Sequence, residues 1–264
     1  LKKTMEPELT EKLHSIACRA AKAECLDLPE TTDVTRQVEL ESSALRIYRQ
    51  LVKESYAELS GGEVTVTNIL TRLLRLSQLT GGFLGNDETA CAEQVSGAKL
   101  DALTDILDSA QAEGKKLVVI ARFLPEIKAI CKLLEKRGLR YSLITGAVKD
   151  REEQVAQFQS DPEVSVFVGQ IATAGLGITL TAASTMVFYS LDYSMSNFEQ
   201  TKARIHRLGQ HDPCTYIFLM AKGTVDEKVL KALRAKADLA KTLVDEYRGG
   251  RNPFDEQEVL HGFK

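Results

Sequence analysis

The stretch Leu117-Val-Val-Ile-Ala-Arg-Phe-Leu-Pro-Glu-Ile-Lys-Ala-Ile-Cys-Lys-Leu-Leu134 decides the fold class of this 264-residue chain. Its first five residues form a short apolar run, which is typical of a strand buried on both faces. Pro125 then stands where the first turn of a helix tolerates proline. Apolar residues recur after it at helical spacing, at Ile127, Ile130, Cys131 and Leu134. The stretch therefore predicts a buried strand followed by an amphipathic helix, the repeating unit of a parallel sheet.

The same alternation continues toward the C-terminus. The pattern predicts further strands over 141–144, 164–168, 186–189 and 216–220. It predicts helices over 99–113, 151–158, 197–208 and a long last helix from Thr224. The predicted fold class is α/β, a parallel sheet with helices on both faces.

The first 96 residues have a different pattern, which predicts a mainly helical connector. Helices are expected before residue 30, over 42–59 and over 67–79, with one exposed strand over 33–41. Glycine, asparagine and aspartate make 81–97 a linker by composition. We therefore expect a connector over 1–96, the α/β domain with its closing helix over 97–247, and a flexible tail over 248–264.

Composition excludes several classes of protein. The chain has 34 Lys plus Arg against 37 Asp plus Glu, so nucleic acid could bind only through a local patch. No apolar run reaches the roughly 18 residues of a membrane helix, and residues 1–25 do not resemble a signal peptide. The five cysteines are not spaced as zinc ligands, so no metal site is expected. We expect an intracellular, cytoplasmic protein with no membrane partner.

The segment Ser196-Asn-Phe-Glu-Gln-Thr-Lys-Ala-Arg-Ile-His-Arg-Leu-Gly-Gln210 is the most informative for function. Ser196 and Glu199 have capping-box spacing, which predicts that a helix begins there. Gln200, Arg204 and Arg207 would then share one face of that helix. Arginine suits phosphate because it stays charged and donates two parallel hydrogen bonds. The same spacing also occurs on ordinary solvated helices, so the segment alone leaves both interpretations open.

A second segment, Gly169 to Ser184, follows a predicted buried strand and carries a Gly-x-Gly pattern at Gly175 and Gly177. Glycine allows sharp turns and close approach of the backbone to a ligand. In open parallel sheets, ligands bind beyond the carboxyl ends of the strands. Alone, this pattern also fits an ordinary turn.

Taken together and in this order, these segments resemble the Swi/Snf-type DNA translocases, within superfamily two of the helicases. The stretch 117–123 resembles motif IV of that family, 174–184 resembles motif V, and 200–210 resembles motif VI. The strong resemblance covers about 115–245 and is especially like the compact bacterial and phage-type members. It implies a RecA-like sheet, the second of two such lobes with ATP and Mg bound between them.

The resemblance also implies roles for individual residues. Arg204 and Arg207 would be the catalytic arginine fingers. Nucleotide binding would involve Gln200, Gly175, Gly177 and Gln210. The DNA backbone would pass near Arg122, Phe123, Thr145, Gly146 and Thr181. The implied partners are double-stranded DNA and an N-terminal RecA-like lobe on the same polypeptide.

Some residues depart from the family pattern. Ala203 stands where many members have Asp, and Tyr193 where many have Trp. No Gly-x-x-x-x-Gly-Lys-[Ser/Thr] and no Asp-Glu-x-His or Asp-Glu-x-Asp occurs in the sequence. We therefore expect this chain alone to bind no ATP stably and to hydrolyse none. The alternative is a non-catalytic module that keeps the fold of the lobe and binds nucleic acid or protein.

Overall fold

The computed structural model describes residues 27–60, 66–86, 91–175 and 177–235. Several expectations lie outside these residues: the helix before residue 27, the end of the last helix, and the tail over 248–264.

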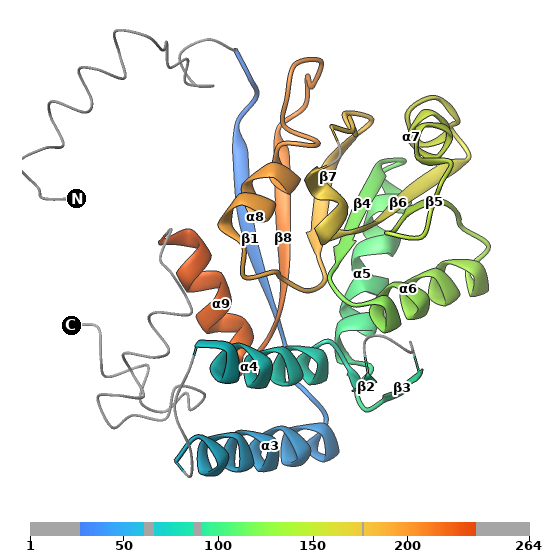
Figure 1. Cartoon of the computed structure of the whole chain (residues 1–264). Coiled ribbons are helices and arrows are strands. Elements are labelled where there is room, and N and C mark those ends of the chain that lie inside the picture. Colours follow the sequence, from blue (N-terminus) through green and yellow to red (C-terminus); the bar gives the residue numbers. More distant parts are fainter. Residues whose placement is uncertain (1–26, 61–65, 87–90, 176, 236–264) are drawn as a thin grey trace, which may run out of the picture.

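A six-stranded parallel sheet forms the centre of the protein (Figure 1). Its order is β1-β8-β7-β4-β6-β5, and every neighbouring pair is parallel. The central strands are apolar on both faces; Val118, Val119 and Val187, for example, are fully buried. The α/β fold class is thereby confirmed. The bounds of the strands are β1 Thr31–Val38, β4 Lys116–Ala121, β5 Arg140–Ile144, β6 Val164–Gln170, β7 Ala183–Phe188 and β8 Cys214–Ala221.

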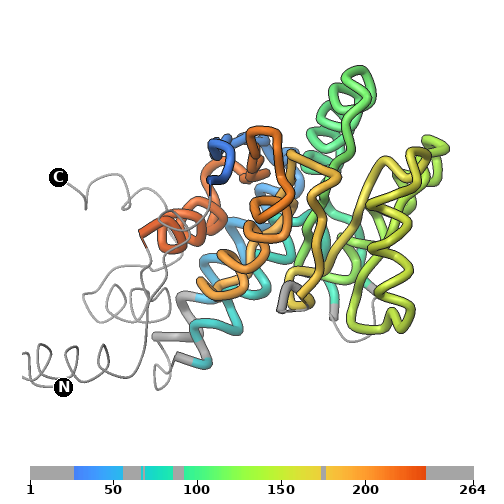
Figure 2. The backbone as a smooth tube through the Cα atoms, turned by 90° about the horizontal axis from the view of Figure 1, so that it is seen from above, coloured from blue at the N-terminus to red at the C-terminus, as the bar shows by residue number. Residues whose placement is uncertain are grey.

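Helices cover both faces of this sheet. Figure 2 shows α5 on one face and α8 on the other. On the α8 face, the ring of Phe198 packs 5.5 Å from that of Phe188 and 5.9 Å from that of Phe218, measured between centroids. This aromatic group joins α8 to β7 and β8. The helices of this region are α5 Ala98–Ala112, α6 Leu124–Lys136, α7 Arg151–Ser160, α8 Met195–Lys202 and α9 Val225–Arg234.

The connector is part of the same packed body. Its strand β1 forms the edge of the main sheet and pairs with β8 along its whole length. Its helices α3 (Ser42–Ser60) and α4 (Val66–Thr80) lie beyond the carboxyl end of β1 (Figure 1). The hydroxyl of Tyr48 accepts a hydrogen bond from the backbone amide of Val225, 2.9 Å away. The boundary at residue 96 stays a prediction, although the sheet takes its first strand from before it.

The expectation of a linker over 81–97 is wrong. This segment contains two antiparallel strands, β2 (Phe83–Asn86) and β3 (Cys91–Gln94). Composition misled because glycine serves here in a tight turn: Gly82 has φ +96, and its carbonyl accepts from the amide of Val95 at 2.8 Å. Phe83 then packs into the interior with 7% exposure.

The helix expected over 197–208 differs at both ends. Ser194 caps it rather than Ser196, accepting from the amide of Asn197 at 3.2 Å. The helix ends at Lys202, so Arg204 and Arg207 are not on a helical face with Gln200. The helix stops because the Arg204 carbonyl accepts from the Leu180 amide, 2.9 Å away, rather than from a later helical amide. Tertiary contacts therefore override the helical spacing of the sequence.

Candidate functional site

Arg204 and Arg207 lie in the turn that follows α8, residues 203–209, which we name the arginine turn. The Nη1 atom of Arg207 donates to the carbonyl of Ile178 at 3.2 Å. With the bond between Leu180 and Arg204, this contact joins the arginine turn to the loop after the Gly-x-Gly pattern. The structure thus brings the two segments singled out in the sequence side by side.

The arginine turn concentrates positive charge. Partial burial, and then the nearby charge of Arg207, lower the pKa of the Arg204 guanidinium from its usual value. Two like charges held this close repel each other, and an anion placed between them would remove that repulsion. Neighbouring arginine side chains are chemically suited to bind phosphate, because each guanidinium can donate two parallel hydrogen bonds.

The residues expected to touch nucleotide have different surroundings. Gln200 is exposed on α8, where its amide donates to the Ser196 hydroxyl at 3.1 Å. Gly175 ends a short 3₁₀ helix, η2, over Ile171–Gly175, which contacts α8. A Cβ built on the exposed Gly177 would meet no heavy atom within 4 Å. Nothing in the described part of the chain therefore requires glycine at position 177.

The Gln210 side chain was expected to contact nucleotide, but it is hydrogen-bonded within the protein. Its side chain is buried, and its Nε2 donates to the carbonyls of Ala183 at 2.9 Å and Ile205 at 3.2 Å. Its Oε1 accepts from the amides of His211 and Asp212, both at 3.0 Å. These bonds close the arginine turn against the start of β7 and occupy both ends of the carboxamide.

Three of the expected DNA contacts lie at one edge of the sheet. Thr145 and Gly146 follow the carboxyl end of β5, and Arg122 follows that of β4. Gln170, at the end of β6, bridges them: it accepts from the Gly146 amide at 3.3 Å and donates to the Arg122 carbonyl at 3.4 Å. The sequence interpretation missed Gln170, although a polar residue that ends a buried strand is a usable signal.

The surroundings of the Arg122 guanidinium and of two other expected DNA contacts, Phe123 and Thr181, do not match a common surface. The guanidinium of Arg122 lies 3.9 Å from the centre of the Tyr193 ring and 3.9 Å from a carboxylate oxygen of Asp192. Phe123 is buried, with 3% exposure. Thr181 comes just before the amino end of β7, at the opposite edge of the parallel sheet from Thr145 and Gly146. The structure therefore does not gather all five residues along one surface.

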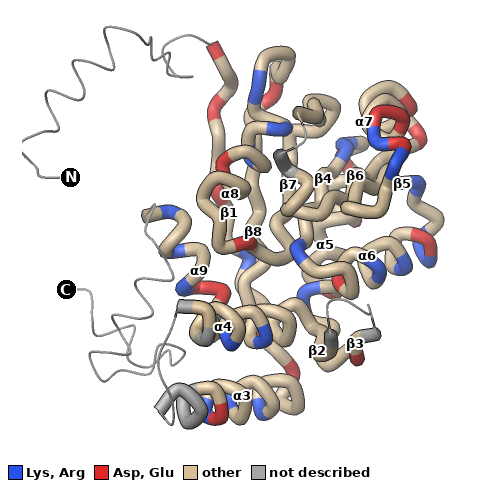
Figure 3. Tube along the Cα trace, viewed as in Figure 1, with Lys and Arg blue, Asp and Glu red and all other residues tan. Residues whose placement is uncertain are grey.

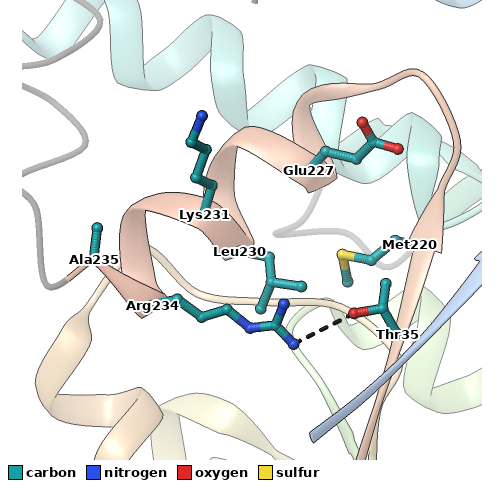
Figure 4. A pocket seen from close by; sticks show the side chains of 7 residues that line it. All are labelled: Thr35, Met220, Glu227, Leu230, Lys231, Arg234 and Ala235. Atoms are coloured by element: carbon teal, nitrogen blue, oxygen red, sulfur yellow. Dashed lines mark hydrogen bonds between the residues drawn. The ribbon is translucent and has the colours of Figure 1, made fainter. Parts of the chain in front are cut away.

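A hollow lies between β1 and α9, away from the arginine turn (Figure 4). It is an open groove of about 500 Å³, and Arg234 reaches across it to the Thr35 hydroxyl at 3.3 Å. None of the residues singled out in the sequence lines it. Within the described ranges, no three His, Cys, Asp or Glu side chains could hold a metal together. In those same ranges, no helix is long and apolar enough to cross a membrane.

Parts of the sequence are similar to known proteins. Residues 98–209 match the model of the helicase conserved C-terminal domain. The chromatin-remodeling ATPase INO80 of Mycosarcoma maydis is 34% identical over 152 residues, 57% of this chain and 8% of that protein. INO80 of Drosophila melanogaster is 32% identical over 148 residues, 55% of this chain and 9% of that protein. The chain thus matches less than a tenth of the length of these relatives.

Solved structures share the fold. The SWI2/SNF2 ATPase core domain of Sulfolobus solfataricus has a TM-score of 0.69 at 21% identity, covering 94% of this chain and 55% of that one. The C-terminal part of the Fun30 ATPase domain has a TM-score of 0.63 at 15% identity, covering 78% and 90%. The sources that these matches name give no support to a bacterial or phage-type origin.

Residues 98–209 therefore match the helicase conserved C-terminal domain in sequence, and they lie within a RecA-like fold. The chain is similar in sequence to the INO80 chromatin-remodeling ATPase over 152 residues, and it shares the fold of the SWI2/SNF2 ATPase C-terminal domain of Sulfolobus solfataricus.

Proposed function

We propose that this chain is the second RecA-like lobe of an ATP-dependent DNA translocase. The observation that carries the proposal is the arginine turn itself, in which the Arg207 guanidinium donates to the Ile178 carbonyl and the Arg204 backbone carbonyl accepts from the Leu180 amide. In this role, Arg204 and Arg207 stabilise the negative charge that develops on the transferring phosphoryl group.

The residues fit one end of an ATP molecule. Two adjacent guanidiniums suit the phosphates, whereas no cluster of carboxylates that could bind Mg²⁺ occurs in the described ranges. We infer that Mg²⁺ and the remaining phosphate contacts come from an N-terminal lobe on the same polypeptide. Mg²⁺ would there neutralise phosphate charge. Gln200 and the backbone at Gly175 and Gly177 would face the nucleotide.

DNA would lie along the carboxyl ends of β4, β5 and β6. The SWI2/SNF2 ATPase core of Sulfolobus solfataricus was solved in complex with dsDNA, and it has a TM-score of 0.65 and 22% identity to this chain. The partly exposed Arg122, beside the exposed Gly146, offers positive charge of the kind that binds phosphate without reading sequence. Lys and Arg also occur on α3 and α4, including the exposed Arg46 and Arg75, and would add positive charge (Figure 3).

The 264-residue chain alone is expected to hydrolyse no ATP, with or without duplex DNA, because it has no phosphate loop. The measurement is release of inorganic phosphate from the purified chain and from a longer protein that includes the upstream reading frame. DNA-stimulated release from the longer protein alone supports the proposal. Release from the short chain would contradict it. A reading frame that starts near Leu1 would favour the non-catalytic binding module.

The Gly177→Ala variant tests whether glycine is required at position 177 for folding of this lobe or for binding of nucleotide and DNA. The open space around position 177 predicts a change in unfolding free energy below about 0.5 kcal/mol. In the longer protein we expect at least tenfold slower ATP turnover, because the added methyl group would meet nucleotide or DNA. Thermal unfolding of the short chain and turnover of the longer protein test this pair of expectations. Unchanged turnover would remove Gly177 from the proposed site.

A further inference from the structure

The ammonium group of Lys99 lies in the interior at the start of α5, with 1% of its side chain exposed. It donates to Oδ2 of Asp226 at 2.6 Å and to the carbonyl of Tyr189 at 3.0 Å. A buried ammonium is stable only where several acceptors replace its hydration. None of the roles assigned above uses Lys99 or Asp226.

Asp226 connects this ammonium to the rest of the protein. Its Oδ1 accepts from the Thr80 hydroxyl at 2.7 Å, and its Oδ2 also accepts from the Ala221 amide at 3.1 Å. One carboxylate therefore joins the end of α4, the end of β8, the start of α9 and, through Lys99, the residue after β7. These elements lie far apart in the sequence.

The acceptor on the other side of Lys99, Tyr189, begins the segment that leads to α8. The Tyr189 hydroxyl donates to the carbonyl of Gly81 at 3.0 Å, and the next residue, Ser190, bonds to the buried Glu126 at 2.5 Å. Four residues later Ser194 caps α8, which leads directly into the arginine turn. The Tyr189 backbone therefore lies at the start of the short segment 189–194 that leads into that helix.

We propose that Lys99 is a positioning residue for the arginine turn, which it holds in place by fixing the Tyr189 carbonyl against Asp226 and the end of α4. The catalytic consequence rests on the proposed function, whereas the structural part does not. The competing explanation is an ion pair that only stabilises the fold. The two explanations differ in what happens when both charges are removed together.

Lys99→Met leaves Asp226 buried without its cation and should destabilise the chain strongly. Lys99→Met combined with Asp226→Leu removes both charges and should recover stability, yet the Tyr189 carbonyl still has no donor. Lys99→Gln keeps an uncharged N–H donor on a side chain that is one bond shorter. Arg36→Met is the matched control, because it breaks an exposed ion pair with Asp105 on the same helix α5.

The experiment measures amide hydrogen exchange in the 264-residue chain, comparing 189–204 with β4. We expect exchange over 189–204 to be at least tenfold faster in Lys99→Met and in the double variant, with β4 of the double variant near wild type. Lys99→Gln should restore slower exchange over 189–204, and Arg36→Met should change neither region. Wild-type exchange over 189–204 in the double variant would overturn the proposal. If the double variant stays unstable, equal exchange in the Met and Gln variants would overturn it.

A second arm uses the longer ATPase. In the double variant kcat should fall at least tenfold while KM for ATP stays within about threefold, because positioning affects the transition state more than binding. Wild-type kcat in a stable double variant also overturns the proposal. A wild-type longer protein without ATPase activity would refute the proposed function instead, and hydrogen exchange would still decide the positioning role.

Discussion

Arg207→Ala in the longer ATPase is expected to lower the rate of ATP turnover by about 10³–10⁵-fold while leaving ATP binding nearly unchanged. The reason is that an arginine finger acts on charge that appears only in the transition state. Arg204→Ala is expected to have an effect of similar size, since the charge of Arg207 acts on the Arg204 guanidinium. Single-turnover hydrolysis and equilibrium binding of a nucleotide analogue separate the two steps.

Controls are needed because Arg207 also bonds to the carbonyl of Ile178. Arg207→Lys keeps the charge but not the planar pair of donors, so its turnover should fall between those of wild type and alanine. Arg140→Ala removes an exposed arginine that pairs with Asp161 at 2.9 Å, and it should leave turnover unchanged. Near-normal turnover in a folded Arg207→Ala protein would rule out the finger assignment.

Glu126→Gln should make the chain more stable at alkaline pH. Burial raises the pKa of the Glu126 carboxyl to about 7, against the opposing effects of the Ser190 hydroxyl and the Lys99 charge. One oxygen accepts from Ser190 and from the Phe123 amide, while the other, Oε1, has no hydrogen-bond partner in the described ranges. An isosteric amide can keep the first set of contacts and removes the cost of burying a negative charge.

The sign of the effect follows from proton linkage. The folded chain holds the Glu126 proton more tightly than the unfolded chain, where the pKa is near 4.5. The stabilisation from this proton is therefore fully present below about pH 4.5 and is lost as the pH rises through 7. Relative to wild type, the Gln variant should gain on the order of 3 kcal/mol in unfolding free energy between pH 5 and pH 8.5.

Denaturant unfolding at a series of pH values measures this difference. Glu163→Gln, at an exposed position, controls for removing one carboxylate from the surface. Wild-type and Glu126→Gln stabilities that run parallel from pH 5 to pH 8.5 would show that Glu126 carries no proton in the folded chain at neutral pH.

The sequence predicted the elements whose signal is local. Apolar runs such as 117–121 are typical of buried strands in an α/β pattern, and β4 is found there. The arginine turn could not be predicted in its true form, because α8 ends through a bond from Leu180, a residue 24 positions before Arg204. Spacing along a chain carries no information about such a bond.

Some features of the candidate site could be predicted from the sequence and others could not. The order of the motifs indicated that Arg204 and Arg207 belong with the Gly-x-Gly loop, and the structure places them together. Phe123 and Gln210 matched family positions, yet both side chains are buried. The sequence gives no sign of Lys99, because its partner Asp226 lies 127 positions later, in the first turn of α9, where an acidic residue is ordinary. Burial and long-range pairing, which decide these cases, become visible only when the chain is folded.

Because β1 pairs with β8, a fragment must contain both strands if its sheet is to be complete. A piece covering only 98–209 would lack both β8 and β1, leaving β7 as a bare edge beside a large apolar surface. Such an edge invites association with other chains. Expression boundaries should therefore begin before Thr31 and extend past Arg234, so that the sheet keeps all of its strands and α9 still covers β8.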